Sequence, residues 1–374
     1  MSRKKAFTRQ VTVDTPDWMR DFRARWQLNG KRMVLAPRGP WAVLAPFISH
    51  WLGRVVFTPA APTAADPHPV GGLRFALGPK VPPLAGLEMT NGGRMANRMM
   101  QFINAVYLAE RLGLPVILSH EKKLVPLAAT AARSVAILPA KSKGQKGFFL
   151  KSRFFFDEDF GPHHPRLLDG LTAADRHRIT RDYVAPAMGF GPLDPARQQA
   201  QARDLAVHIR SGDIFPQDGR KPNAWYIQPP LAFYKKVITE RLAEGLIDRV
   251  VIVCEDRRNP CIDALEVWLG ENNIPMALQN GTLDEDLAYL RHARHFVFGT
   301  GTFGYGVAML AGQIDTLAVF SHEAENYAGM LTIARLEHYT AAPERYIEPG
   351  RWQASAAQKQ LMLDFPAEDL RLRV

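Results

Sequence analysis

Cysteine is scarce in this sequence of 374 residues, which contains only Cys254 and Cys261. Two cysteines are too few for a disulfide scaffold or a cysteine-based metal site, so we expect a reducing, cytoplasmic setting. No apolar run reaches the roughly 18 residues of a membrane span. The basic residues 1–5 are followed by polar residues instead of the apolar core of a signal peptide. We therefore expect neither a membrane-spanning nor a secreted protein.

The chain also lacks the spacing motifs of common metal and nucleotide enzymes. It contains no CxxC pair, no HExxH motif and no Walker A loop, and His163 and His164 form a lone doublet that is typical of a polar loop. Paired carboxylates for glycoside hydrolysis are not identifiable. We therefore expect no metal site and no cofactor held by a familiar motif.

Positive charge, in contrast, is abundant and uneven. The net charge is +10, and residues 1–54 carry eleven Lys or Arg against three Asp, with a second excess between Lys122 and Arg153. Such patches attract nucleic acid, anionic lipid or an anionic substrate, or form a solvated face. No nucleic-acid-binding motif accompanies them, so we expect no nucleic-acid partner.

The apolar residues 41–52 lie between Arg38 and Arg54. They suit either a helix lying on a membrane surface or a packed N-terminal element. The first reading predicts peripheral contact with the inner face of a membrane.

The length and the 47% hydrophobic content allow two cores, so we expect two domains. Residues 58–85 are rich in Pro, Ala and Gly, which makes residues 1–85 a basic extension and linker. Residues 86–200 form the first predicted domain. It opens with a strand, a glycine turn and a helix with one apolar face, and residues 141–195 are expected to be less regular. The members of that apolar face are Met95, Met99, Phe102, Val106 and Ala109.

Residues 201–374 form the second predicted domain. Apolar strands at 205–210, 249–254, 274–278, 295–299 and 316–320 alternate with helical segments. Thr282 and Glu285 have capping-box spacing before one of these helices. Strict alternation predicts an α/β fold with a doubly wound parallel sheet.

Polar and apolar residues alternate through His208, Arg210 and Asp213, up to the carboxyl end of a predicted strand. Open α/β sheets bind ligands at that end. Sugar transfer from a nucleotide diphosphate leaves negative charge on the β-phosphate, and a guanidinium can stabilise this charge without a metal. The alternative is that Arg210 and Asp213 form a structural ion pair.

Two further segments end strands of the same sheet. Residues 300–306 are rich in Gly and Thr and precede a helix, as in many anion sites, although a tight turn would look the same. Glu255 and Asp256 follow another strand. A carboxylate there can accept hydrogen bonds from the N1 and N2 donors of guanine, or can be a solvated loop acid.

At these residues the chain resembles the fucosyltransferase superfamily, which includes α-1,2-, α-1,6- and protein O-fucosyltransferases. Residues 91–102, NGGRMANRMMQF, are similar to the family's GGRLGNQMFQY element, and residues 208–213 to its HxRxGD motif. Residues 286–290 and 301–305 are similar to its C-terminal stretch. The resemblance spans roughly residues 87–320. It implies a GT-B-like fold with two Rossmann-like domains, in which residues 86–200 form the acceptor-side domain and residues 201–374 the nucleotide-sugar-binding domain. It also implies inverting, metal-independent transfer of fucose from GDP-fucose to a glycan or glycolipid.

The resemblance also implies site residues. Arg210 would be catalytic through the β-phosphate, His208 and one of the two acids would address guanine, and Asp213 would support Arg210. The predicted donor-binding residues are His208, Ser211, Asp213, Glu255, Asp256, Thr300, Thr302, Phe303, Gly304, Asn91, Gly92, Gly93, Arg94 and Asn97.

The chain departs from the family pattern at Ala96, Arg98 and Gly304. The alternatives are therefore a transferase for another GDP-sugar and a nucleotide-sugar-binding protein without turnover. No catalytic base is identified.

Overall fold

The structure is a computed structural model. It describes residues 34–38, 57–59, 73–75, 84–90, 92–154, 168, 170–217, 219–321, 331, 333–342 and 344–373. The predicted site residue Asn91 and the apolar residues 41–52 lie outside the described residues.

The first unit is built on a five-stranded sheet whose order is β1-β7-β4-β5-β6. Strands β4, β5, β6 and β7 are mutually parallel, and β1 pairs antiparallel with β7. The strands are β1 (Val34–Arg38), β4 (Leu84–Met89), β5 (Val116–Ser119), β6 (Ala136–Pro139) and β7 (Gly147–Ser152). A separate antiparallel pair consists of β2 (Phe57–Pro59) and β3 (Leu73–Phe75).

Helix α3 (Met95–Arg111) connects β4 to β5 and covers one face of this sheet. All five residues of the predicted apolar face are at most 5% exposed. The helix ends just before Gly113, whose φ of +65° favours glycine. The predicted strand and helix are therefore confirmed, and the spacing of the apolar residues correctly identified the face of the helix that packs on the sheet.

The second unit is built on a seven-stranded sheet whose order is β10-β9-β8-β11-β12-β13-β14. Only the last pair is antiparallel. The strands are β8 (Asp204–His208), β9 (Arg249–Val253), β10 (Met276–Gln279), β11 (His295–Phe298), β12 (Thr316–Phe320), β13 (Arg335–Ala341) and β14 (Leu370–Arg373). The alternation predicted from residue 204 onward is confirmed.

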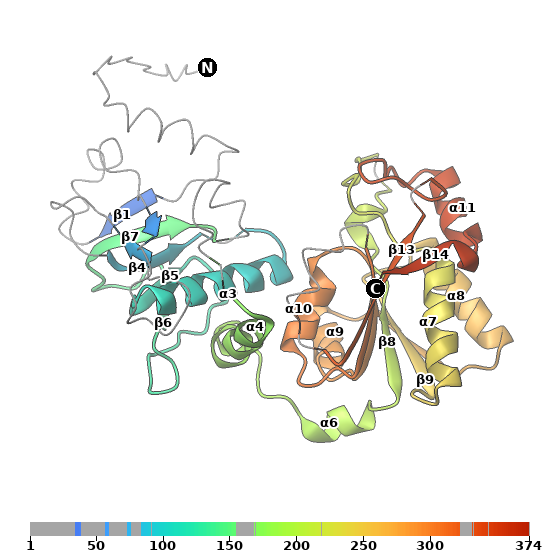
Figure 1. The fold of residues 1–374 in the computed structure, drawn as a ribbon, viewed down its shortest axis with the longest axis horizontal. Helices are drawn as coiled ribbons and strands as arrows, with labels where there is room; N and C mark the ends of the chain where they lie inside the picture. Colours follow the sequence, from blue (N-terminus) through green and yellow to red (C-terminus); the bar gives the residue numbers. More distant parts are fainter. Residues whose placement is uncertain are drawn as a thin grey trace, which may run out of the picture.

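Helices cover both faces of the second sheet, as Figure 1 shows. Helices α7 (Leu231–Ala243), α8 (Pro260–Glu271) and α11 (Ala356–Asp364) pack on one face. Helices α9 (Leu283–Leu290) and α10 (Thr302–Leu310) pack on the other, toward the first unit. The predicted capping box is present at the start of α9, where the Thr282 and Glu285 side chains each accept from the other residue's backbone N–H.

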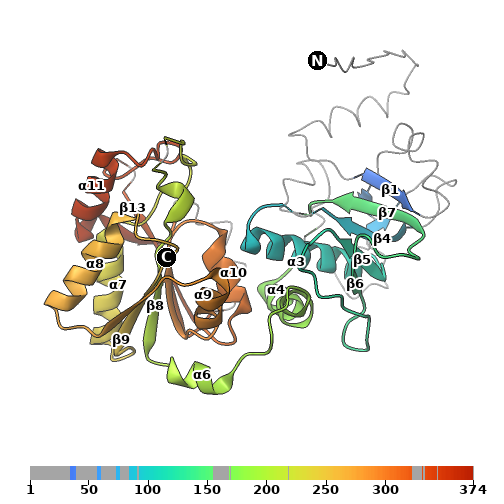
Figure 2. The same cartoon turned by 180° about the vertical axis from the view of Figure 1, so that it is seen from behind.

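The segment between the sheets is more regular than predicted. Residues 141–195 contain β7, helix α4 (Ala173–Ile179), a π-helical turn (Thr180–Val184) and α5 (Ala185–Ala187). Helix α6 (Pro195–Ala200) then leads into β8, and both views show it below the two units (Figure 2). These elements are short, so the sequence offered little periodicity from which to predict them.

The apolar core is not divided in the same way as the sheets. One continuous cluster joins α3 and the first sheet to α9, α10 and the adjoining face of the second sheet. The other large cluster lies under α7, α8 and α11. The two large clusters therefore do not correspond to the two sheets, because one of them spans the contact between the units.

Strand β1 also departs from expectation, since residues 1–85 were predicted to lie outside the domains. Val34–Arg38 is the edge strand of the first sheet, and Arg38 donates to Glu88 at 2.8 Å. An edge strand paired with residues more than 100 positions later leaves no local signal. The other predicted domain boundaries stay predictions.

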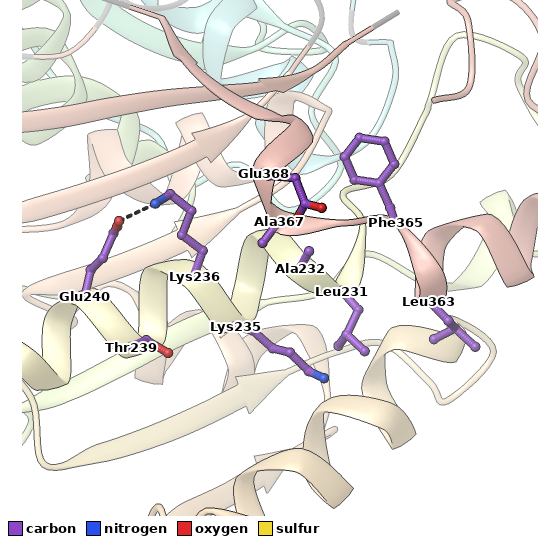
Figure 3. Close-up of a pocket in the computed structure, with 10 residues that line it drawn as sticks. All are labelled: Leu231, Ala232, Lys235, Lys236, Thr239, Glu240, Leu363, Phe365, Ala367 and Glu368. Carbon is purple, nitrogen blue, oxygen red and sulfur yellow. Dashed lines mark ion pairs between the residues drawn. The ribbon is translucent and has the colours of Figure 1, made fainter. Parts of the chain in front are cut away.

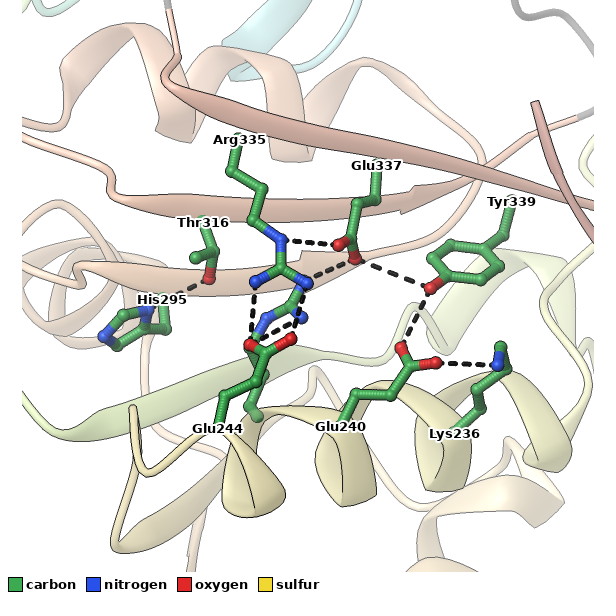
Figure 4. Close-up of polar contacts among 9 residues, drawn as sticks. Lys236, Glu240, Glu244, His295, Thr316, Arg335, Glu337 and Tyr339 are labelled. Carbon is green, nitrogen blue, oxygen red and sulfur yellow. Dashed lines mark hydrogen bonds and ion pairs between the residues drawn. The ribbon is translucent and has the colours of Figure 1, made fainter. Parts of the chain in front are cut away.

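A network of charged side chains lies toward the amino ends of the strands of the seven-stranded sheet (Figure 4). The Arg241 side chain on α7 is 1% exposed and pairs with Glu337 on β13 and with Glu244. Arg335 joins both acids, 2.7 Å from each. These groups neutralise one another between α7 and β13 and none was predicted as a site residue.

Two Rossmann-like α/β units side by side are the arrangement of the GT-B class. The predicted fold class is therefore confirmed: the protein is α/β and GT-B-like, with two sheets of mainly parallel strands.

Candidate functional site

The predicted C-terminal site residues gather at the carboxyl edge of the second sheet, where the chain changes direction. From β8 the chain crosses through α7 to β9 on one side, and from β11 through α10 to β12 on the other. Such a switch point leaves a crevice between the two strand ends. Residues 208–213 and 299–304 follow these two strands, so the fold brings both motifs together.

Arg210 lies two residues beyond β8 and its side chain is 16% exposed. Its guanidinium carbon lies 4.2 Å from the centre of the Tyr226 ring, and Nη2 lies 3.3 Å from the Asp213 carboxylate. Among the described residues its Nε has no hydrogen-bond partner. The guanidinium is thus held by an aromatic face and one half-exposed carboxylate, with donor capacity left for a ligand.

Gly301 forms the opposite wall of this arginine site. Its φ is +123°, and a Cβ at this position would lie 2.7 Å from Nη1 of Arg210. A larger residue would displace the guanidinium. Glycine is therefore required here both by the backbone conformation and by the close approach.

The turn leads into α10 without a side-chain cap on the first helical N–H groups. The buried Thr300 hydroxyl has no partner among the described residues. The Thr302 hydroxyl donates to Oδ1 of Asn97 on α3 at 2.6 Å. The uncapped helix start and the free hydroxyl give this turn the donors of an anion site, while Thr302 ties it to the first unit.

His208 ends β8 and is half-buried, with its ring centre 4.6 Å from that of Phe303. Burial and, next, the nearby Arg210 charge lower the pKa of His208 to about 3. The imidazole is therefore neutral near pH 7, where it can donate one hydrogen bond and accept another.

Glu255 and Asp256 differ sharply in their surroundings. Asp256 accepts from the Ser211 hydroxyl at 2.5 Å and from Nε of Arg258 at 2.7 Å. Burial alone would raise the pKa of Asp256, but the hydrogen bonds from Arg258 and Ser211 hold it well below its usual range. Glu255 is 57% exposed and lies 3.7 Å from Arg94. Only Glu255 keeps an open carboxylate.

Ser211 is buried and belongs to the framework of the site. Its oxygen accepts from the backbone N–H of Asn259, the N-cap of α8, while Nδ2 of Asn259 donates to the Arg210 carbonyl at 2.9 Å. These bonds fix the backbone on the carboxyl side of the arginine. Ser211 therefore holds the strand end in place instead of facing the crevice.

The first unit contributes the predicted residues after β4. Arg94 lies 3.2 Å from Asp213 and 3.7 Å from Glu255, which makes it a bridge between the units. Gly93 has a φ of +82°, and a Cβ there would clash with Asn97. The buried Gln101 amide donates to the Gly92 carbonyl at 2.9 Å and accepts from its N–H, which holds this turn.

Two family departures have a packing reason. A Cβ at Gly304 would lie 2.2 Å from the Phe298 ring, so the family's serine has no room. Gly304 packs against β11 and offers no side chain to a donor. A Cβ at Gly306 would lie 2.8 Å from Cβ of Ala96, so two small residues let α10 and α3 cross closely.

Sequence reasoning missed Tyr226, Asn259 and Gln101. Tyr226 lies in a loop, where an aromatic residue carries no periodic signal. Asn259 precedes a proline at the start of a helix, and this N-cap pattern could have located it. Gln101 lay within the matched segment of the family resemblance.

A cavity of about 600 Å³ lies elsewhere, between α7 and the C-terminal segment (Figure 3). Leu231, Lys235, Leu363 and Phe365 are among its lining residues, and no predicted site residue lines it. Within the described ranges no cluster of three His, Cys, Asp or Glu side chains suits a metal ion. No described helix is long and apolar enough to cross a membrane.

No protein-family model matches the chain, and no curated protein matches it by sequence. Among solved structures it is similar to POFUT1 in complex with GDP, with 13% identity, a TM-score of 0.35, and 63% of this chain and 98% of that chain covered. It is also similar to the ADP-heptose LPS heptosyltransferase II of E. coli, with 10% identity, a TM-score of 0.34, and 76% of this chain and 96% of that chain covered.

For a family 9 glycosyl transferase of Veillonella parvula, the identity is 7% and the TM-score 0.38, with 75% and 97% covered. Structural likeness at these values identifies no function.

Proposed function

We propose that the protein is an inverting, metal-independent glycosyltransferase that transfers fucose from GDP-fucose to a glycan or glycolipid acceptor. The observation that carries this proposal is Arg210, held between Tyr226 and the Gly301 turn with unused donors at a switch point. A fixed guanidinium in such a crevice suits the charge that develops on a leaving diphosphate.

In the proposed reaction the acceptor hydroxyl oxygen attacks the anomeric carbon from the face opposite the nucleotide, and the hydroxyl proton passes to water. The bond between that carbon and the β-phosphate oxygen breaks, and its electron pair leaves with GDP. Arg210, Thr300 and the first N–H groups of α10 stabilise the departing phosphate. Asp213 and Tyr226 orient the guanidinium.

Glu255 is the better candidate of the two acids for guanine recognition. The Asp256 carboxylate is taken up by Ser211 and Arg258, whereas Glu255 faces solvent beside the crevice. Neutral His208 contributes a further polar group. The pairing of a carboxylate with guanine N1–H and N2–H predicts that uracil and adenine bind less tightly.

Calorimetry against GDP, UDP and ADP tests this assignment. We expect GDP to bind about tenfold more tightly than UDP or ADP, or better. A base that covers the Glu255 carboxylate without donating hydrogen bonds to it leaves a polar group unpaired, which costs about 1–3 kcal/mol. Glu255→Gln should reduce the preference. Equal affinity for GDP and UDP would remove the guanine assignment.

A hydrolysis and transfer assay with GDP-fucose, GDP-mannose and a UDP-sugar tests donor and turnover. The absence of a serine hydroxyl at Gly304 favours another GDP-sugar as the second candidate, so preference for GDP-mannose would select it. Turnover should be unchanged by EDTA, since no cofactor besides the GDP-sugar is proposed. Activity lost in EDTA and restored by manganese would show that a metal takes the role given to Arg210.

We place this activity in the cytoplasm, with the basic residues 1–54 at the inner face of a membrane. The excess of eight positive charges in that segment supports the placement. Fractionation of cells at low and high salt tests it: the protein should sediment with membranes only at low salt.

A further inference from the structure

The acceptor-side unit is much more basic than the donor-side unit. Residues 86–200 carry sixteen Lys or Arg and ten Asp or Glu, a net charge of +6. Residues 201–374 carry eighteen Lys or Arg and twenty-three Asp or Glu, a net charge of −5. The donor is an anion, yet the positive excess lies on the other unit, which calls for a second anionic ligand group.

Most cations near the carboxyl edge of the first sheet are already paired. Arg38 and Lys151 pair with the buried Glu88 carboxylate, which the His120 ring also contacts, each within about 3 Å. Arg98 pairs with Glu121. These arginine and lysine side chains are therefore framework charges.

Arg153 differs from them. It follows β7, it is exposed, and among the described residues it has no ion-pair partner. Its guanidinium lies against Gly92: a Cβ there would be 3.2 Å from Nε and 3.3 Å from Nη2. Gly92 follows β4, and β4 and β7 flank the switch point of the first sheet, since β4 connects through α3 to β5 on the other side.

The surrounding backbone holds this arginine in place. Thr90 N–H donates to the Ser152 carbonyl at 2.8 Å, and Gln101 clamps Gly92. The next residue, Phe154, is fully buried with a φ of +54°, and its carbonyl accepts from Nδ2 of Asn104 at 3.0 Å. Such a strained, buried turn persists only where the surroundings enforce it.

Arg153 also lies near the proposed donor site. Gly92 is two residues from Arg94, which reaches Asp213 and Glu255 of the second unit. Among the described residues, a guanidinium without an ion-pair partner therefore lies beside the turn that leads to Arg94 and the donor site.

We propose that Arg153 binds an anionic group, a phosphate or a carboxylate, on the saccharide acceptor. The inference rests on the proposed function and narrows its acceptor class to acidic saccharides. The planar fork of arginine matches both groups through paired hydrogen bonds.

The test uses galactose, galacturonic acid and galactose 6-phosphate, which differ only at C6, titrated into GDP-saturated full-length protein by ligand-observed NMR. We expect at least one acid to bind about tenfold more tightly than galactose. Arg153→Gln should reduce that advantage to less than twofold. The two acids distinguish phosphate from carboxylate recognition.

Lys143→Gln is the matched control, because it removes one exposed charge from the same unit. It should keep the advantage at physiological salt. Equal binding of the three sugars, no binding of any, or equal losses in both variants would overturn the proposal. So would an Arg153→Gln variant that loses GDP affinity as strongly as acid binding, since Arg153 would then serve the donor.

Failure of the proposed function remains distinguishable. Wild-type protein that binds no GDP contradicts that function, while the difference between wild type and Arg153→Gln toward the acids still tests Arg153. Normal GDP binding without any preference for acids contradicts only the acceptor inference.

Discussion

Arg210 and Arg241 lie toward opposite edges of the same sheet and are held in opposite ways. Arg241 is 1% exposed and pairs with Glu244 and Glu337, while Arg335 adds a second cation to the same acids. Arg210 has one carboxylate, an aromatic ring and an open side. The charges around Arg241 are paired with one another and serve the fold. Among the described residues, Arg210 keeps hydrogen-bond donors without a protein partner, so it can bind an anionic ligand.

The largest expected effect is on stability, at Arg241. Arg241→Met leaves two carboxylates short of a partner, and breaking a buried pair costs about 3–5 kcal/mol. Urea unfolding should show this loss, with normal turnover of the protein that stays folded. Arg335→Gln, at a position 40% exposed, should cost under about 1 kcal/mol. Near-wild-type stability of Arg241→Met would show that the Arg241 network is not structural and would contradict the comparison with Arg210.

The second effect is on turnover, at Arg210. Arg210→Lys keeps the charge but loses the planar fork, so we expect turnover to fall by about two orders of magnitude, as on loss of a preorganised oxyanion donor. GDP affinity should also weaken, and the melting temperature should not change. A steady-state assay beside a melting curve checks both, and a destabilised but fully active variant would make Arg210 structural.

The third effect is at Tyr226, which lies under Arg210. A partly desolvated cation–π contact contributes about 1–2 kcal/mol, so Tyr226→Leu should reduce kcat by roughly tenfold. Tyr226→Phe keeps the ring and should retain most activity. If both variants lose activity equally, the hydroxyl and not the ring face matters.

The smallest effect, less than about 1 kcal/mol, is that of lowering the pH from 7 to 6. The pKa of His208 is lowered from 6.5 to about 3 in the folded protein, so below pH 6.5 the unfolded chain takes up a proton that the folded protein does not. Stability should therefore fall as the pH decreases from 6.5, by up to about 1.4 kcal/mol per pH unit from this group. In urea unfolding at several pH values, His208→Gln should show a shallower fall. An unchanged slope would mean that His208 is solvated.

The sequence was most informative where local pattern and topology coincide. Alternating apolar strands and the Gly-rich turn predicted that Arg210 and Thr300 would meet, because parallel strands share one carboxyl edge. It was least informative where tertiary contacts decide. Arg258 donates hydrogen bonds to Asp256, whereas the Glu255 carboxylate stays accessible to a ligand, and no local sequence pattern distinguishes these two adjacent acids. Strand β1 and Tyr226 were missed because distant pairing and loop aromatics leave no periodicity.

Helices α3 and α10 cross closely at Ala96 and Gly306, inside an apolar cluster that both units share. This contact limits how the two halves can be expressed separately or exchanged with those of a relative. Neither half is expected to fold when expressed alone, because each would expose the apolar face that the other covers. A chimera that takes its donor half from a relative must carry a matching small residue on the partner helix. Exchange of specificity by recombination is therefore limited to loops, such as those bearing Arg153 and Glu255.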